Sequence, residues 1–298
     1  MVAPTGEQFT ITAGGYEAVL VEGGGIRTLT FEGTDVLAGY PLEERPAGGR
    51  GQVLMPWVNR VRDGAWSFDG QDLQLAISER QTSTAIHGLV RWCSWRPVEV
   101  AGDRVRLGYR LMAQTGYPWT LDVAVEYVVG DDGLVVTMAA TNLADSPAPF
   151  AAGMHPYLAV DAPLVDEVVL TVPAETRQLV DERLLPAGTA PVSWDHDFRT
   201  GRLIGSLELD DAFTDLVRGD DGRAVVRAAT ERGAVELWMD ESFGWTQVFT
   251  GDTLERGARR SLAVEPMTSP ADAFNSGTDL VVIEPGRTWS GTYGVRRA

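Results

Sequence analysis

The chain has 298 residues, enough to bury roughly 75% of its unfolded surface in a hydrophobic core. Its 42 acidic residues outnumber 25 basic ones, all arginine, and the net charge of −17 disfavours nucleic acid and anionic membranes as partners. The single cysteine excludes an intrachain disulfide, and neither a membrane-spanning run nor a secretory signal is visible, so we expect a cytoplasmic protein.

The predicted elements are short strands separated by turns. Apolar runs, residue alternation and β-branched residues predict strands, in chain order, at 55–61, 104–113, 123–129, 134–141, 168–172, 225–229, 234–239 and 280–283. Turn residues between them predict two hairpins, one around 130–133 and one around 231–233. Residues 269–275 are expected to form one helical turn beginning at Pro270.

Turn signals recur about every 8–12 residues, which favours an all-β protein, a large antiparallel β-sandwich, over alternating strands and helices. Length alone suggests about two domains. The stretch richest in glycine and proline, 40–51, is too short for a linker and is flanked by apolar sequence. We therefore predict a single domain covering residues 1–298.

Two of the three histidines lie in apolar segments. His87 is followed by glycine, and His155 precedes Pro156 and Tyr157. Each could be a hydrogen-bonded core residue or a catalyst. His196 lies among acidic residues and is expected on the surface.

Four further segments carry polar or aromatic groups in unusual settings. Asn59 and Arg60 interrupt an apolar run in which an arginine needs a partner. Asp210 and Asp211 lie beside an aromatic residue, and Glu265 ends an apolar strand just before a proline break. Trp245 offers an aromatic face of the kind on which sugars stack. A buried ion pair, turn acids, a strand-end cap and a core aromatic remain the alternative interpretations.

The order of these segments resembles the aldose 1-epimerase (galactose mutarotase-like) family over nearly the whole chain. The resemblance rests on Asn59-Arg60, His87-Gly88, His155-x-Tyr157, Asp210/Asp211 and Glu265, in that order. It implies the large β-sandwich of that family, acting on an aldose sugar.

The resemblance also implies a role for each matched residue. His155 would be the general acid, Glu265 the general base, and His87 would lie beside the ring oxygen. Substrate binding would fall to Arg60, Asn59, Asp210, Tyr157 and Trp245, with Asp211 as the alternative aspartate. Leu89 stands where many relatives carry a second glycine after His87-Gly88, so the loop over the sugar is expected to have a different shape. Pro156-Tyr157 after His155 and Pro266-Met267 after Glu265 indicate a divergent bacterial branch.

The implied reaction interconverts the α and β anomers of a hexose. One base on the C1 hydroxyl and one acid on the ring oxygen suffice, so no metal and no cofactor is expected. Reference pKa values near ~4.3 and ~6.5 predict a bell-shaped pH profile, with Glu265 on the acid limb and His155 on the alkaline limb.

Several alternatives stay open. A hexose-6-phosphate or other anionic-sugar mutarotase would need a local arginine cluster, for which Arg62, Arg91 and Arg96 are candidates. A non-catalytic carbohydrate-binding protein on the same fold would not need both His155 and Glu265. A glycosidase needs two carboxyl groups, and a zinc site on His87 and His155 lacks the usual ligand spacing. The partner is expected to be a small sugar, and the protein a monomer or a homodimer.

Overall fold

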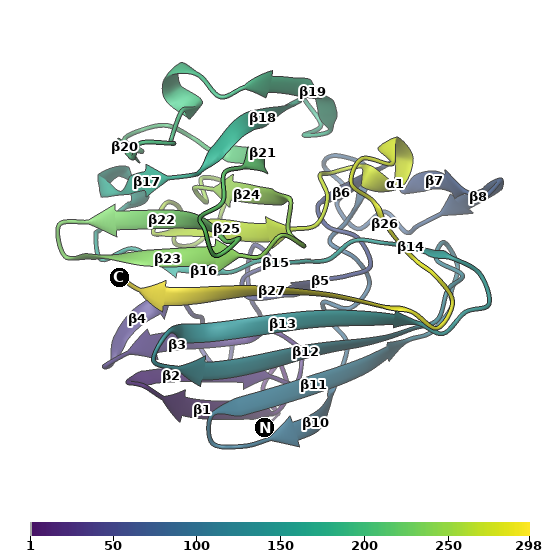
Figure 1. Cartoon of the computed structure of the whole chain (residues 1–298), viewed down its shortest axis with the longest axis horizontal. Helices are drawn as coiled ribbons and strands as arrows, with labels where there is room; N and C mark the ends of the chain where they lie inside the picture. The colour runs from purple at the N-terminus through teal and green to yellow at the C-terminus, as the bar shows by residue number, and fades with distance from the viewer. Residues whose placement is uncertain (1) are drawn as a thin grey trace.

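A computed structural model describes residues 2–298. Two large antiparallel sheets contain most of the strands and enclose a large hydrophobic core, with a smaller cluster around Trp245 and Met267 (Figure 1). The first sheet has twelve strands, in the order β1 (Gln8–Ala13), β2 (Tyr16–Val21), β3 (Ile26–Phe31), β4 (Thr34–Leu37), β16 (Tyr157–Ala159), β25 (Ser261–Met267), β24 (Trp245–Phe249), β21 (Asp210–Leu216), β18 (Ala174–Val180) and β19 (Pro186–Pro191), with β15 (Gly153–Met154) beside β25 and β5 (Val53–Leu54) beside β15.

The second sheet has nine strands. Their order is β10 (Arg96–Val100), β11 (Arg104–Leu111), β12 (Leu121–Gly130), β13 (Gly133–Asn142), β27 (Thr288–Arg297), β23 (Gly233–Met239), β22 (Ala224–Thr230), β17 (Val169–Thr171) and β20 (Arg202–Leu203). Strand β12 shows why such sequences form the sandwich, because its residues alternate strictly between buried and half-buried. Each buried apolar side chain contributes about 1.5–3 kcal/mol.

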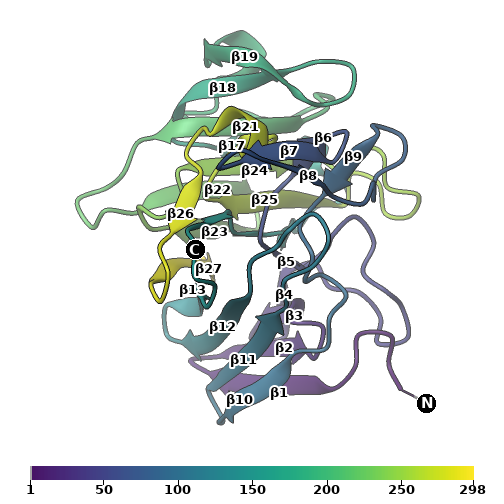
Figure 2. The same ribbon diagram turned by 90° about the vertical axis from the view of Figure 1, so that its right-hand side faces the viewer.

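Smaller elements gather at one end of the two sheets, on the right in Figure 1 and facing the viewer in Figure 2. They are the pairs β6 (Arg60–Arg62) with β9 (Thr84–Ile86), β7 (Ala65–Phe68) with β8 (Gln71–Gln74), and β14 (Ala148–Phe150) with β26 (Val281–Ile283), and the helix α1 (Ala273–Ser276). Two short 3-10 helices, η1 (Val165–Glu167) and η2 (Trp194–His196), complete the described elements. With four residues, the longest helix in residues 2–298 is far too short to cross a bilayer.

The all-β sandwich predicted from the sequence is confirmed, and so are both hairpins. Strands β12 and β13 pair across the first predicted turn, and β22 and β23 pair across the second. The predicted helical turn is shorter than expected, since α1 begins at Ala273 and not at Pro270.

Two strand predictions were wrong in detail, and both errors fall beside the site. The run at 55–61 is not continuous, because Asn59 has a left-handed backbone (φ 49°) and β6 begins only at Arg60. The proline after Glu265 does not end its strand, since β25 runs on to Met267.

The neighbouring strands explain why β25 accepts this proline. The N–H groups of Val264 and Thr268 donate to the carbonyls of Pro156 and Ala152 on one side of β25. Alternation places the nitrogen of Pro266 on that same side, between β15 and β16, where the neighbouring strand is interrupted at His155. A missing N–H therefore costs little at this position.

Candidate active site

One cavity of about 1070 Å³ brings together most of the residues predicted to form the site. It is lined by Asn59, Arg60, His87, His155, Asp210 and Glu265. The segments that supply them are far apart in sequence and meet at the middle of the first sheet, around β25. The cavity is large enough to enclose a monosaccharide.

At the base of the cavity His155 and Glu265 form a buried pair. Nε2 of His155 lies 3.2 Å from Oε1 of Glu265, and the two residues are only 5% and 2% exposed. Oε2 of Glu265 and Nδ1 of His155 have no hydrogen-bond partner. A buried polar atom without a partner costs about 1–3 kcal/mol. A ligand that supplies hydroxyl groups would relieve this cost.

His87 is the second imidazole of the site and meets the first edge-on. The ring centroids of His87 and His155 are 5.5 Å apart. The backbone N–H of His87 donates to the carbonyl of Asn59 (2.9 Å), and Nδ1 of His87 is buried without a partner. His87, His155 and Glu265 thus each carry one buried polar atom without a partner.

The glycine after His87 fixes this histidine's position. Gly88 has φ +74°, and a Cβ added there would lie 1.9 Å from the carbonyl oxygen of Met55. Gly70 has the same φ of +74° but open space around the added Cβ. An alanine causes the same backbone strain at both positions but a steric clash only at Gly88. Comparing the two substitutions therefore separates the effect of the clash from the effect of the strain.

We expect Gly88→Ala to lower the melting temperature by at least ~4 °C more than Gly70→Ala does, because the backbone of Met55 must move. Thermal unfolding followed by circular dichroism measures both. Equal shifts for the two variants would show that the close approach at Gly88 is not a packing constraint.

A polar network lines the cavity beside Glu265. The Gln247 side chain accepts from Nδ2 of Asn59 (3.3 Å) and donates to Oδ1 of Asp210 (2.6 Å). Nε and Nη2 of Arg60 donate to the two carboxylate oxygens of Glu79 at 2.7 and 3.0 Å. This bidentate pair is the partner that the sequence required for a buried arginine, and it holds the guanidinium in one orientation.

The structure distinguishes the two neighbouring aspartates. On β21, successive side chains point to opposite faces. Asp210 lines the cavity, whereas Asp211 pairs with Arg177 at 3.1 Å and lies 3.8 Å from His196. Asp210 is therefore the aspartate of the site.

The two aromatic residues predicted to bind substrate lie outside the cavity lining. Tyr157 is buried, stacks on His155 with centroids 5.1 Å apart, and donates its hydroxyl to the carbonyl of Gly48. It supports the histidine from behind. Trp245 is 3% exposed and donates its indole N–H to Asp279. Its position in the core does not fit the predicted sugar contact.

Burial shifts the ionisation of the pair in opposite directions. Burial, followed by the negative charge of Asp210, raises the pKa of Glu265 well above its usual range. Burial, followed by the positive charge of Arg91, lowers the pKa of His155 to about 3. The pKa of His87 is lowered as well, mainly by burial. A proton shared by the pair therefore resides on Glu265 in the free protein.

A family model described as aldose 1-epimerase matches residues 7–296. The chain belongs to the aldose 1-epimerase family. It is 34% identical to "Uncharacterized protein YihR" from Escherichia coli K12 over 98% of this chain and 95% of YihR. Galactose mutarotase from Homo sapiens is 33% identical over 52% of this chain and 46% of the human protein.

The fold of this aldose 1-epimerase family member is also found in solved structures. The GalM/aldose epimerase homologue from C. elegans superimposes with a TM-score of 0.86 at 23% identity, covering 98% of this chain and 99% of the other. The predicted galactose mutarotase-like sandwich is thereby confirmed. At this identity the similarity establishes the fold alone.

In this member of the aldose 1-epimerase family, the site residues could also be considered as metal ligands. One donor atom each from His87, His155 and Glu265 lies within 4.8 Å of the others. The positive charge of Arg91, which lowers the pKa of both histidines, opposes a cation at the same place.

We therefore expect incubation with EDTA to leave the catalysed rate of anomerisation unchanged. The rate is measured by polarimetry before and after dialysis against the chelator. Loss of activity that added Zn²⁺ restores would establish a metal site on these three residues.

Sequence reasoning missed two residues of the site, Gln247 and Glu79. Gln247 is the polar residue in the middle of the apolar β24, directly opposite Glu265 on β25. A buried glutamine in an apolar strand was the available signal. Glu79 lies in a loop and carries no local signal, because its role depends on its contact with Arg60.

Proposed function

We propose that this protein is an aldose 1-epimerase that interconverts the α and β anomers of a hexose. The observation that carries the proposal is the buried pair of His155 and Glu265 in the lining of a cavity large enough for a sugar, with one polar atom of each residue left without a partner. An isomerase acting on a small sugar follows from this chemistry, and the reaction requires no metal or redox cofactor. A single domain and a cytoplasmic location are part of the same proposal.

The first half of the reaction opens the ring. The reactive form of the pair carries its one proton on His155, so this proton first passes from Glu265 to Nε2 of His155, 3.2 Å away. Glu265 then takes the proton from the C1 hydroxyl, while His155 delivers its proton to the ring oxygen, and the C1–O5 bond breaks. The aldehyde rotates about C1–C2, and the ring closes on its other face with the two proton transfers reversed. The same pair thus serves both directions.

The other residues of the cavity hold the sugar. Asp210 accepts hydrogen bonds from sugar hydroxyls, and the amide of Gln247 donates to Asp210 and holds its carboxylate in place. Arg60, fixed by Glu79, donates to hydroxyl oxygens. His87 lies next to His155 and beside the expected place of the ring oxygen.

The pair must hold one proton to act, so the pH profile of kcat/KM is expected to be bell-shaped. Because the pKa of His155 is lowered and that of Glu265 is raised, the acid limb reports a second proton entering at His155. The alkaline limb reports the last proton leaving Glu265. This assignment reverses the one expected from reference pKa values.

The Asp210→Asn variant tests the assignment. Removing the negative charge of Asp210 lowers the pKa of Glu265, so the alkaline limb of kcat/KM should move to lower pH while the acid limb stays. Asp211→Asn is the matched control, since Asp211 lies on the other face of β21 beside Arg177. An acid limb that moves in Asp210→Asn would contradict the reversed assignment.

The activity itself is tested by following anomerisation of freshly dissolved α-hexoses by polarimetry, or at equilibrium by saturation-transfer NMR. A panel containing glucose, galactose and hexoses with anionic groups covers the expected substrates. We expect exchange above the spontaneous rate for at least one sugar and loss of that excess in Glu265→Gln. Sugar binding without any catalysed exchange would identify a non-catalytic sugar-binding protein instead.

A further inference from the structure

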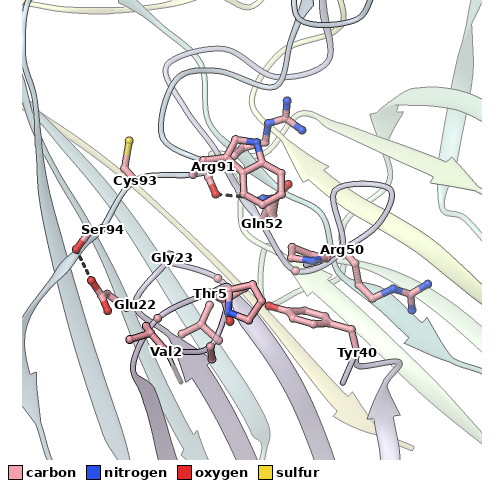
Figure 3. Close-up of a pocket in the computed structure, with 18 residues that line it drawn as sticks. Val2, Thr5, Glu22, Gly23, Tyr40, Arg50, Gln52, Arg91, Cys93 and Ser94 are labelled. Carbon is pink, nitrogen blue, oxygen red and sulfur yellow. Dashed lines mark hydrogen bonds between the residues drawn. The ribbon is translucent and has the colours of Figure 1, made fainter. Parts of the chain in front are cut away.

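A second, smaller cavity of about 260 Å³ adjoins the candidate active site (Figure 3). The two cavities share part of their lining: Tyr40, Pro46, Arg50, Gln52, Arg91 and Trp92. Two of these residues carry positive charge. The boundary between the cavities is therefore basic, in a protein whose net charge is −17.

Neither of the two arginines has a counter-ion. Within residues 2–298, no carboxylate oxygen lies within 4.0 Å of the guanidinium of Arg50 or Arg91. Arg50 donates to the carbonyl of Ala38 (3.0 Å) and to Oγ of Ser261 (3.1 Å), and Arg91 donates to the carbonyl of Ile86 (3.3 Å). Each guanidinium has five N–H groups, so most of these donors remain free.

Leaving these charges unpaired is costly because both side chains are half-buried. Burial lowers the pKa of both Arg50 and Arg91. Arg60, in the same cavity, shows the alternative arrangement, with a bidentate carboxylate partner in Glu79. The whole wall of the main cavity carries six arginines against five carboxylates, so an anion entering it does not meet the repulsion that the net charge suggests.

Contacts place both arginines at the histidine end of the site. The guanidinium of Arg50 lies 4.1 Å from the centroid of the Tyr157 ring, which stacks on His155. The Ile86 carbonyl bound by Arg91 belongs to the residue before His87. Asp210 and Gln247 lie at the other end, next to Glu265.

Because the arginines lie at the histidine end and Asp210 at the other, the sugar can bind in a defined orientation. In the mechanism above, Glu265 acts at the C1 hydroxyl and His155 at the ring oxygen. The ring oxygen is bonded to C5, and C5 carries the C6 arm. A hexose bound in this way directs its C6 arm toward Arg50 and Arg91.

We propose that the substrate is a hexose with an anionic group at C6, and that Arg50 and Arg91 bind this group. The proposal rests on the proposed epimerase function and names its substrate class. A phosphate, sulfonate or carboxylate shares the required chemistry, namely two or three oxygens that accept charge-assisted hydrogen bonds from a guanidinium.

Two further residues of the shared lining fit this arrangement. The side-chain oxygen of Gln52 is buried without a partner, while its amide nitrogen donates to the carbonyl of Arg91 (3.1 Å). That oxygen can accept a hydrogen bond from a sugar hydroxyl beside the anion. The acidic residue of the smaller cavity, Glu22, bonds to Ser94 and to the N–H of Glu7, on the side away from Arg50 and Arg91 (Figure 3).

The alternative candidates Arg62 and Arg96 do not take part. Arg62 lies 3.5 Å from Asp272 and 3.8 Å from Asp181, and Arg96 is exposed on β10. Of the three arginines singled out in the sequence, Arg91 alone reaches the cavity. Arg50 follows a glycine pair in the loop at 40–51, and no local pattern there indicates a binding role.

The test compares sugars that differ only at C6. Catalysed anomerisation of glucose, glucose 6-phosphate, glucuronate and 6-deoxy-6-sulfoglucose is measured by NMR exchange with the wild type. We expect kcat/KM for at least one anionic sugar to exceed that for glucose by ~10-fold or more, the effect of a charge-assisted contact. The sugar with the highest kcat/KM identifies the preferred anion as phosphate, carboxylate or sulfonate.

The variants Arg50→Gln and Arg91→Gln are each expected to reduce this ratio by ~10-fold or more. Using the ratio to glucose cancels any effect of Arg91 on the pKa of His155. Arg80→Gln is the matched control, because it removes the same charge from an exposed position outside the cavity lining. It should leave the ratio unchanged, and thermal unfolding verifies that all three variants fold.

The possible failures are distinguishable. If glucose is anomerised at least as efficiently as every anionic sugar, or if the ratio survives in the Arg50→Gln/Arg91→Gln double variant, the anionic subsite is wrong and the epimerase function stands. If no sugar is anomerised but the wild type binds an anionic sugar at least ~10-fold more tightly than glucose, the subsite stands and the epimerase function is wrong.

Discussion

Replacing Glu265 by glutamine is expected to lower catalysed anomerisation by at least ~10²-fold, the usual effect of losing one acid–base group. Glutamine has nearly the same shape and keeps an acceptor oxygen near Nε2 of His155, which lies 3.2 Å from the carboxylate. It cannot take a proton from the C1 hydroxyl. The rate constant is measured by NMR exchange at saturating sugar, after subtracting the spontaneous reaction.

The stability of this variant provides an internal control. Burial raises the pKa of Glu265, so the folded protein holds a proton there that the unfolded chain releases above pH ~4.3. The contribution of Glu265 to wild-type stability is therefore most favourable below that pH and becomes less favourable as pH rises toward the folded pKa. Glutamine never ionises, so Glu265→Gln should melt no lower than the wild type at neutral pH.

A second variant tests whether the position of the carboxylate matters. Glu255 lies exposed on the rim of the same cavity, and Glu255→Gln makes the same chemical change there. It should retain full activity. Activity of Glu265→Gln within threefold of the wild type would refute the assignment of Glu265 as the base.

Replacing His155 by glutamine is expected to reduce kcat by ~10²-fold or more while changing sugar affinity much less. The imidazole is needed chiefly when the C1–O5 bond breaks and the ring oxygen takes up a proton. An amide can still form hydrogen bonds but cannot deliver a proton. Saturation-transfer NMR measures binding, and exchange kinetics measure turnover on the same samples.

The matched control for this variant is His196→Gln, because His196 lies beside Asp211, outside the cavity. It should leave both turnover and binding intact. If His155→Gln instead loses binding while its kcat survives, His155 is a contact to the substrate and not the acid.

Much of the candidate site could be predicted from sequence because it depends on residues that stand out locally. A glutamate in an otherwise apolar strand and histidines in apolar runs are conspicuous, and their order along the chain resembles one family. The β-sandwich was predictable for a related reason, since alternation in β11 and turn residues before β13 are local signals.

The remaining features depend on which strands become neighbours, and no local pattern contains that information. Gln247 belongs to the site because β24 pairs with β25 in a register that places it opposite Glu265. Asp210 rather than Asp211 faces the cavity because of the face that β21 turns inward. The sequence suggested that a sugar stacks on Trp245, but on its strand this side chain donates its indole N–H to Asp279.

The position of β27 has a consequence for how the chain is made. This strand lies between β13 and β23 in the nine-stranded sheet, although the ribosome synthesises it after both. Until it emerges, β13 and β23 present unpaired edges to other nascent chains, and such edges promote aggregation. Because these contacts span long stretches of sequence, we expect slow folding and a dependence of soluble yield on chaperones that bind nascent chains.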